Sequence, residues 1–346
     1  MSMTQTGPAP AERPSVSVII PVYNSLSTLG RALSSVFGQT IDAITEVMVV
    51  DDGSEEDIEG FLARHFPQVI HLRQKRSGPA PARNAGVARA TGDLVAFLDA
   101  DDVWLPDKLE KQLAVLAQRP EVEFLLSRHY RVYPSGHRIA GGDFPEVFQI
   151  GLPDWFSSYR RRRLGRPMCP SGFLMTRRLY LQLGGQDTGW TSMADWHLVM
   201  RALIAHHAVL IMGEPLFDYH IVPGSVSNHH RKRDLQRLSE QLLGFMTHLQ
   251  HSAEAGEVAL DPLLLRRLIL EERITRSRLL LRHGYLQGAY ETLLPVFERT
   301  TPAGTRLGQW PAVTGIRMLR QLLGHRSTRL QQFTLAFAQS WYKLVP

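Results

Sequence analysis

The chain has 346 residues, of which 44% are hydrophobic and 21% are charged, as in ordinary globular proteins. This composition excludes a disordered chain and a collagen-like repeat, and the single cysteine, Cys169, excludes a disulfide scaffold. The net charge of +6 is unevenly distributed: residues 1–228 carry 22 Lys and Arg against 24 Asp and Glu, whereas residues 229–346 carry 17 against 9. We therefore expect a near-neutral body and a basic C-terminal region with a different task.

Strands and helices are predicted to alternate up to residue 120, because apolar runs of strand length are separated by stretches of helical periodicity. Before them, residues 1–14 are polar and proline-rich and are interpreted as a flexible leader. In chain order the predictions are a strand at 16–22, a helix capped by Ser27 and reaching Phe37, a strand at 47–50, a helix at 55–65, a strand at 69–72, a helix at 80–90, a strand at 94–98 and a helix from Pro106 to about Pro120.

This alternation predicts an α/β fold with a mostly parallel sheet covered by helices on both faces. Beyond it, two short strands between 122 and 140 flank a turn at 134–136 and predict a hairpin, so the second half of a domain over 15–228 should be α+β. Residues 229–346 are predicted to be helical. Their Leu-rich segments lie near 234–252, 262–282, 285–299 and 313–344.

Carboxylates follow two of the predicted strands. Asp51 and Asp52 end one, and Asp99, Asp101 and Asp102 end another. Ligands of open α/β sheets bind outside the carboxyl ends of the strands, and carboxylates gathered there repel one another. A divalent cation would offset that repulsion, and an oxygen-rich site favours Mg²⁺ or Mn²⁺. Ordinary turn chemistry explains Asp51 and Asp52 alone equally well.

Several motifs occur in a characteristic order: PVYN, QT, VVDDGS, ARNAG and ATGDLVAFLDADDVWLPDKL. The series resembles the family 2 glycosyltransferases, inverting enzymes of the GT-A fold that use nucleotide sugars. The resemblance is dense over roughly residues 16–110 and looser to about 228. It implies that residues 15–228 are a GT-A glycosyltransferase domain, and it does not reach the C-terminal region.

The resemblance also implies a nucleotide-binding face. One of Asp51 and Asp52 would accept a hydrogen bond from the base, as expected for N3–H of uracil or thymine. Small residues before Arg83 would allow close approach of a nucleotide to the start of a helix. The residues expected to bind the nucleotide sugar, in addition to Asp51 and Asp52, are Pro21, Val22, Tyr23, Arg83, Asn84 and Asp99.

The family's D-x-D motif corresponds to Asp99 and Asp101. Asp101 would bind the metal, Asp99 would bind the ribose or the metal, and Asp102 is the second-choice ligand. Trp104, just past the motif, and Trp196 are the candidates for contact with the acceptor. For Trp104, packing in a half-buried position is an equally good interpretation.

The catalytic base is expected in the stretch that matches the family's acidic pair before a helix. Inversion needs a carboxylate that takes a proton from the attacking hydroxyl. Asp195 occupies the second acidic position and is the predicted base; Ala194 replaces the usual Glu, and His197 stands where an acidic residue is common. The alternative is that Asp195 is only a helix N-cap.

The sequence therefore predicts a metal-dependent inverting glycosyltransferase of the hexosyl or N-acetylhexosaminyl type. It would move a sugar from a nucleotide sugar, with a UDP-sugar favoured, to a glycan, glycolipid or protein acceptor in surface polysaccharide or glycoconjugate assembly. The alternative is a non-catalytic nucleotide-sugar-binding protein, for which the hints are Ala194 and Val222, the latter standing where many family members have His. Dinucleotide oxidoreduction is excluded because no G-x-G-x-x-G follows the first strand.

The basic C-terminal helices predict a contact with a partner protein or with the surface of a membrane, although packing on the protein's own domain is the commoner use of such a face. Nucleic acid is a poor candidate, because no series of base-stacking aromatic residues accompanies the arginines. No window reaches the roughly 18–20 apolar residues of a membrane span. We expect a cytoplasmic protein that is at most peripheral at the inner face of the membrane.

Overall fold

The computed structural model describes residues 14–140, 145–152, 155, 169–190, 193–222, 232–256, 260–263, 265–266, 269 and 273. The chain divides into two compact units, Met1–Ser225 and Val226–Pro346. The domain limits expected from the sequence, 15–228 for the glycosyltransferase domain and 229–346 for the basic helical region, stay predictions.

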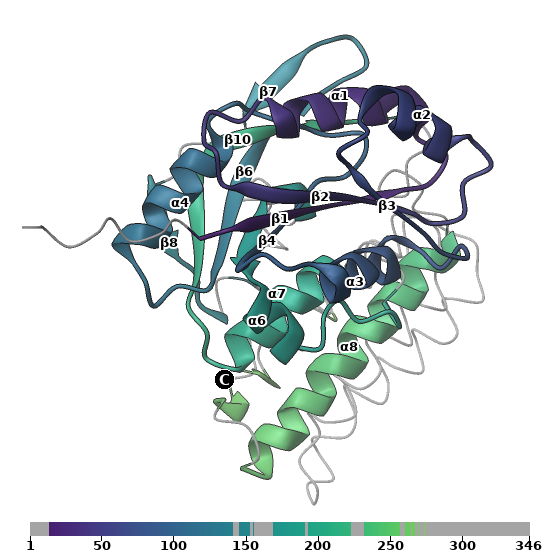
Figure 1. The fold of residues 1–346 in the computed structure, drawn as a ribbon. Helices are drawn as coiled ribbons and strands as arrows, with labels where there is room; N and C mark the ends of the chain where they lie inside the picture. Colours follow the sequence, from purple (N-terminus) through teal and green to yellow (C-terminus); the bar gives the residue numbers. More distant parts are fainter. Residues whose placement is uncertain are drawn as a thin grey trace, which may run out of the picture. The chain divides into compact units, whose positions relative to one another are not determined.

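A sheet of ten strands forms the centre of the first unit, counted over the residues that the structure describes (Figure 1). Its main path runs β3-β2-β1-β4-β9-β6-β10-β5, with β7 beside β6 and β8 beside β10. The strands are β1 Val16–Val22, β2 Ile44–Asp51, β3 Ile70–Arg73, β4 Leu94–Phe97, β5 Val103–Trp104, β6 Phe124–Val132, β7 Arg138–Ala140, β8 Val147–Gln149, β9 Phe173–Thr176 and β10 Val209–His220.

The sheet is parallel through β3, β2, β1 and β4, as the alternation of strands and helices predicts. β9 then runs antiparallel between β4 and β6, and β10 pairs in parallel with β6. The carboxyl ends of β1, β2, β4, β6 and β10 therefore meet at one edge, which we call the carboxyl edge. The mixed second half agrees with the loss of alternation in the sequence after residue 121.

Helices cover both faces of the parallel part of the sheet. Figure 1 shows α1 and α2 on one face and α3 on the other. Residues of α1, α2 and α4 share one hydrophobic cluster with alternate residues of β1. The helices of this unit are α1 Leu26–Phe37, α2 Ile58–His65, α3 Pro79–Arg89, α4 Lys108–Gln118, α6 Arg177–Gln182 and α7 Ala194–Ile204, with a 3₁₀ turn, η1, at Pro170–Gly172.

The two faces of β1 divide its side chains between these layers. Successive side chains of a strand point to opposite faces. Val18 and Ile20 belong to the cluster with α1 and α2. Ile19 faces α3, where Gly86 approaches so closely that a Cβ on Gly86 would lie 2.6 Å from Ile19 Cγ2. Every residue of β1 is buried, as expected for a strand covered on both faces.

The predicted element boundaries shift in several places. Ser27 lies inside α1, whose N-cap residue is Ser25, so the predicted cap is wrong. α4 begins at Lys108, because residues after Pro106 first form a turn that brings the Lys108 N–H to the Leu105 carbonyl at 3.1 Å. The predicted hairpin is present as β6 and β7, closed by a bond of 2.8 Å from the Gly136 N–H to the Tyr133 carbonyl.

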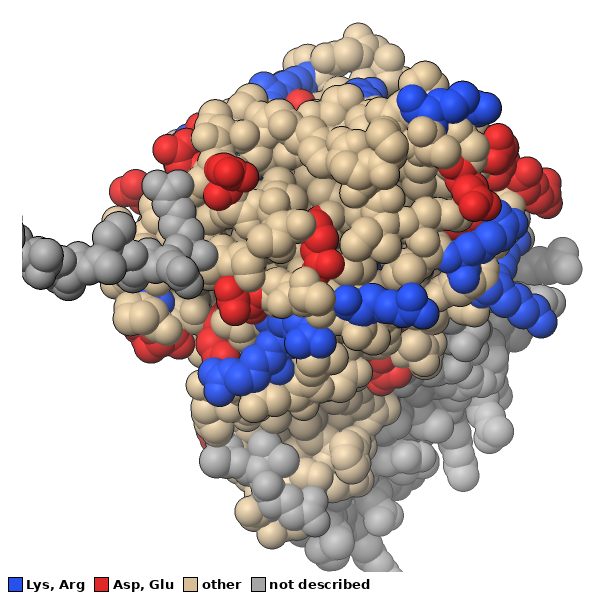
Figure 2. Space-filling view, viewed as in Figure 1, with Lys and Arg blue, Asp and Glu red and all other residues tan. Residues whose placement is uncertain are grey.

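In the second unit, α8 spans Lys232–Glu254 and includes the helix predicted at 234–252. The helices predicted at 285–299 and 313–344, and most of the one at 262–282, lie outside the described residues. None of the described helices is long and apolar enough to cross a membrane. Figure 2 shows acidic and basic side chains interspersed on the face in view, consistent with the nearly balanced charge of residues 1–228.

The contact between Gly86 and Ile19 predicts the effect of one methyl group. Gly86→Ala gains up to about 1 kcal/mol of helix propensity, but its Cβ enters space that Ile19 and Val50 fill. Overpacking typically costs about 1–3 kcal/mol. We expect a net loss of stability in urea denaturation. Gly244→Ala in α8, where a Cβ would meet nothing within 4 Å, is the control and should not lose stability; equal effects would contradict the close packing of α3.

Candidate active site

Carboxylates from both predicted clusters reach the carboxyl edge. Asp51 is the last residue of β2 and Asp52 follows it. Residues 99–102, here called the carboxylate loop, follow β4. The N–H of His220, the last residue of β10, donates to Asp102 Oδ1 over 3.1 Å, so both halves of the sheet meet at this loop. This is the place where open α/β sheets bind ligands.

Asp51 and Asp52 are both buried, and each carboxylate accepts hydrogen bonds from backbone N–H groups of a neighbouring loop. Asp51 accepts hydrogen bonds from the Ser54 N–H at 2.7 Å and from Arg73 Nη1 at 2.6 Å. Asp52 accepts from the N–H groups of Ser77 at 2.8 Å and Gly78 at 2.7 Å, and so fixes the loop before α3. A hydrogen bond from a base to either carboxylate stays a prediction.

Tyr23 follows the last residue of β1 at the same edge, where the sequence predicts a nucleoside pocket. Pro21 and Val22 are buried in the strand end, whereas Tyr23 is half-buried. The guanidinium of Arg76 lies over the Tyr23 ring, 4.1 Å from its centroid. Arg76 lies outside the sequence motifs, in the loop between VVDDGS and ARNAG.

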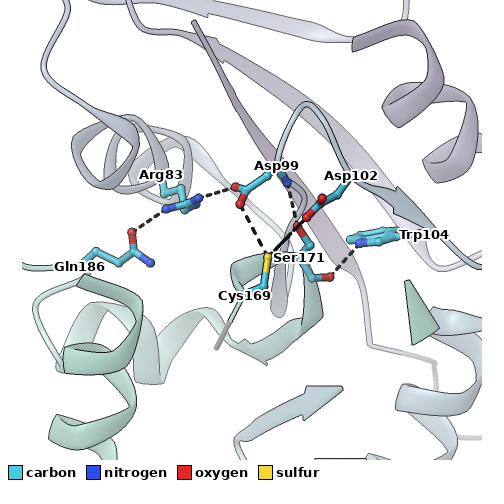
Figure 3. A network of polar contacts seen from close by, with 7 residues as sticks. All are labelled: Arg83, Asp99, Asp102, Trp104, Cys169, Ser171 and Gln186. Atoms are coloured by element: carbon cyan, nitrogen blue, oxygen red, sulfur yellow. Dashed lines mark hydrogen bonds and ion pairs between the residues drawn. The ribbon is translucent and has the colours of Figure 1, made fainter. Parts of the chain in front are cut away.

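A buried arginine connects α3 with the carboxylate loop (Figure 3). Arg83 is 6% exposed; its Nη2 forms an ion pair with Asp99, and its Nη1 donates to Gln186 Oε1 over 3.1 Å. Burial disfavours the charge on Arg83, but the Asp99 carboxylate outweighs burial and raises the pKa of the guanidinium. Arg83 is therefore a fixed positive charge beside the loop.

Ser171 of η1 ties the two ends of the carboxylate loop together. Its Oγ accepts from the Asp99 N–H at 3.1 Å and donates to Asp102 Oδ2 at 2.6 Å (Figure 3). Cys169 lies next to it, with Sγ 3.4 Å from Asp102 Oδ2 and 3.8 Å from Asp99 Oδ2. These contacts join segments about 70 residues apart in the chain.

The donor atoms of Asp99, Asp102 and Cys169 lie within 4.8 Å of one another. Burial and the charges of its neighbours raise the pKa of Asp102 well above its usual value, and burial with the charge of Asp99 raises that of Asp101 to about 6. Carboxylates that resist ionising together are the setting that a divalent cation stabilises, so the donor set fits such an ion. Asp101, the ligand favoured from the sequence, is outside this group, and its role stays a prediction.

Asp195 lies in the first turn of α7, half-buried, and its Oδ1 accepts from the Trp196 N–H at 2.8 Å. Burial raises the pKa of Asp195 to about 6, and the charges of Arg83 and Asp99 also act on it. The helix thus brings Asp195 to the Arg83–Asp99 pair. The residue before the helix is Met193, so the alternative that Asp195 is an N-cap is wrong.

Asn84 positions the segment that carries Gln186. Its Oδ1 accepts from the Tyr180 hydroxyl at 2.6 Å and from the Gln186 N–H at 2.8 Å, and its Nδ2 donates to the Gln186 carbonyl at 2.8 Å. Gly185 is needed here, since its φ is +70° and a Cβ would lie 2.6 Å from Asn84 Oδ1. Direct contact of Asn84 with a nucleotide stays a prediction.

Both tryptophans predicted at the acceptor are buried. Trp104 donates from Nε1 to the Ser171 carbonyl over 2.9 Å (Figure 3). The Trp196 ring lies 6.4 Å from the Trp190 ring, measured between centroids. The structure gives both a packing role, and contact with an acceptor stays a prediction.

Sequence reasoning missed Cys169, Ser171 and Gln186 as members of this network. No local pattern gives them a role here, because Cys169 and Ser171 reach the carboxylate loop, and Gln186 reaches Arg83, only through tertiary contacts. The one available signal was that Cys169 is the chain's only cysteine.

Comparisons with known proteins agree with this architecture. Residues 17–184 match the family described as Glycosyl transferase family 2. An uncharacterized glycosyltransferase of Haemophilus influenzae is 29% identical over 192 residues, which cover 54% of this chain and 62% of that protein. The amylovoran biosynthesis glycosyltransferase AmsB of Erwinia amylovora is 28% identical over 232 residues, which cover 62% of this chain and 72% of AmsB. The chain thus spans less than two thirds of the length of the Haemophilus protein.

The crystal structure of S. aureus TarS 1–349 in complex with UDP-GlcNAc has a similar fold. Its TM-score is 0.62 at 17% sequence identity, covering 82% of this chain and 81% of that one. Residues 17–184 therefore belong to glycosyl transferase family 2, and the domain has the GT-A fold. The family and the α/β fold class predicted from the sequence are confirmed, and both relatives described here are named glycosyltransferases.

Proposed function

We propose that this chain is a metal-dependent, inverting glycosyltransferase that moves a sugar from a UDP-sugar to an acceptor hydroxyl. The observation that carries the proposal is that Asp195 lies near enough to the Arg83–Asp99 pair, beside the carboxylate loop, for the charges of both residues to act on it. This edge combines carboxylates suited to a cation, a buried positive charge and a further carboxylate whose pKa is raised to about 6. Such a set suits transfer to a hydroxyl with loss of a diphosphate.

The proposed reaction is a single displacement at the anomeric carbon. The acceptor oxygen forms a bond to that carbon as the bond to the donor's β-phosphate oxygen breaks, and UDP leaves with the electron pair. Asp195, ionised, takes the proton of the acceptor hydroxyl. Arg83 is aligned by Gln186 to face negative charge without cost of reorganisation during the step.

Asp99 and Asp102 would hold the cation together with the Cys169 thiol, and Asp101 is proposed as a further ligand. A bound Mn²⁺ or Mg²⁺ would offset the charge of the leaving diphosphate. The protein's own part is to keep the carboxylates together before the ion arrives, through the Ser171 hydroxyl and the His220 N–H.

The nucleotide would lie over the ends of β1 and β2. The half-buried ring of Tyr23 and the guanidinium of Arg76, which lies over that ring, are the groups expected to contact the base. UDP is favoured because a solved neighbour of the same fold is a complex with UDP-GlcNAc. The name of AmsB supports a role in polysaccharide assembly, with a glycan, glycolipid or protein as acceptor.

Asp195→Asn tests the proposed base. The amide keeps the volume and an oxygen for the Trp196 N–H but cannot take a proton. We expect kcat to fall by about 10²–10⁴-fold, the usual contribution of a positioned base, with UDP binding retained in a thermal-shift assay. In the unmodified protein, kcat/KM should rise with pH through about 6, because Asp195 is protonated and inactive below its pKa.

Asp187→Asn is the matched control, since Asp187 is a neighbouring carboxylate that caps a turn through the Gly189 N–H. It should leave both kcat and the pH profile unchanged. Near-normal turnover in Asp195→Asn would remove Asp195 from the role of base. UDP release without transfer to any hydroxyl would leave only a hydrolytic activity, and the absence of any turnover in the unmodified protein would favour the non-catalytic alternative.

The donor set also predicts a spectroscopic signature. Cys169 is the only cysteine in the chain, so a thiolate–metal charge-transfer band on titration with Cd²⁺ can come only from this residue. We expect the band in the unmodified protein and none in Cys169→Ser. EDTA should abolish transfer in both and Mn²⁺ should restore it. A Cd²⁺ titration without the band, in a protein that Mn²⁺ activates, would show that the cation is held by carboxylates without the thiol.

A further inference from the structure

Lys108, the first residue of α4, has a completely buried side chain. Lysine is almost never fully buried without a partner charge, and among the described residues no carboxylate pairs with this one. Burial lowers the pKa of its amine well below the usual value. An apolar side chain would avoid this desolvation cost, so the contribution of the amine must lie in the groups that it orients.

The amine contacts two side chains. Lys108 Nζ donates to Gln112 Oε1 over 2.6 Å and lies 4.1 Å from the centroid of the Trp104 ring. An amine that donates to Oε1 selects one of the two orientations of the Gln112 amide. In that orientation, Nε2 donates to the Gly172 carbonyl over 3.1 Å.

Trp104 and Gln112 thereby bind two successive carbonyls of η1. Trp104 Nε1 donates to the Ser171 carbonyl at 2.9 Å, and Gln112 takes the next one. The turn also packs closely against β6, because a Cβ on Gly172 would lie 2.6 Å from the Ser127 carbonyl oxygen. On the other side of the turn, the Ser171 hydroxyl holds the Asp99 N–H and the Asp102 carboxylate.

We propose that Lys108 is a positioning residue that, through Gln112 and Trp104, holds the 169–172 segment against the carboxylate loop and so prepares the cation site. The proposal rests on the proposed function insofar as it assigns the cation to that loop. The link from amine to carboxylate is continuous: Lys108 fixes Gln112 and Trp104, these fix the η1 carbonyls, and Ser171 fixes Asp102.

The first test measures the turn without any metal. Cys169, the only thiol, reports opening of this segment through its rate of alkylation in the full chain. Lys108→Met keeps an unbranched side chain but removes the donor. We expect its alkylation rate to rise, because the segment opens more often without the Lys108 donor, with the thermal melting temperature nearly unchanged. Lys111→Met is the control: Lys111 is a half-buried lysine of the same helix, bound to Asp107 and Glu214, and this variant should react like the unmodified protein.

The second test measures the cation site by calorimetric titration with Mn²⁺ alone. We expect about tenfold weaker binding in Lys108→Met and no change in Lys111→Met. Gln112→Glu gives a second variant: its carboxylate can still accept from Lys108 but cannot donate to the Gly172 carbonyl. It should therefore show faster alkylation although Lys108 is present.

Unchanged alkylation in Lys108→Met would overturn the proposal, as would faster alkylation that is fully accounted for by a fall in melting temperature, since Lys108 would then be a core residue only. If the unmodified protein fails to bind Mn²⁺, the metal dependence of the proposed function fails, while the alkylation rates still decide the role of Lys108.

Discussion

The negative charge of the carboxylate loop is the constraint on which the rest of the site depends. Three carboxylates within four residues, two of them with raised pKa values, form a stable arrangement only when donors and positive charge surround them. Arg83, the Ser171 hydroxyl and the His220 N–H meet this need from α3, η1 and β10. The cation proposed for the site would offset the negative charge that these groups leave uncompensated.

The fold serves this constraint by bringing distant segments to one edge. The parallel half of the sheet carries the carboxylates, and antiparallel β9, placed between β4 and β6, lies directly after η1. The same insertion leads through α6 to the segment with Gln186, which aligns Arg83. The segment that interrupts the parallel sheet thus carries both Ser171, whose hydroxyl donates to Asp102, and Gln186, which aligns the charged Arg83.

Local pattern was sufficient to predict the parallel strands, their carboxylate ends and the hairpin at β6 and β7, because each depends on short-range periodicity. The role proposed for Asp195 follows from a family resemblance, whereas its proximity to Arg83, a residue more than 100 positions earlier in the chain, depends on the tertiary structure. Ser171 and Lys108 could not be predicted in the same way. Lys108 lies within the quoted motif that ends in WLPDKL, but neither this motif nor the serine after Pro170 shows which groups the two side chains bind, and only the tertiary structure gives them partners.

Anomalous diffraction at the manganese edge, from crystals grown with UDP and Mn²⁺, would locate the proposed cation directly. We expect one strong peak at the carboxylate loop, in contact with carboxylate oxygens of residues 99–102 and with the diphosphate. UDP bound over Tyr23 without a manganese peak at this loop, or a peak held by other residues, would contradict this proposal.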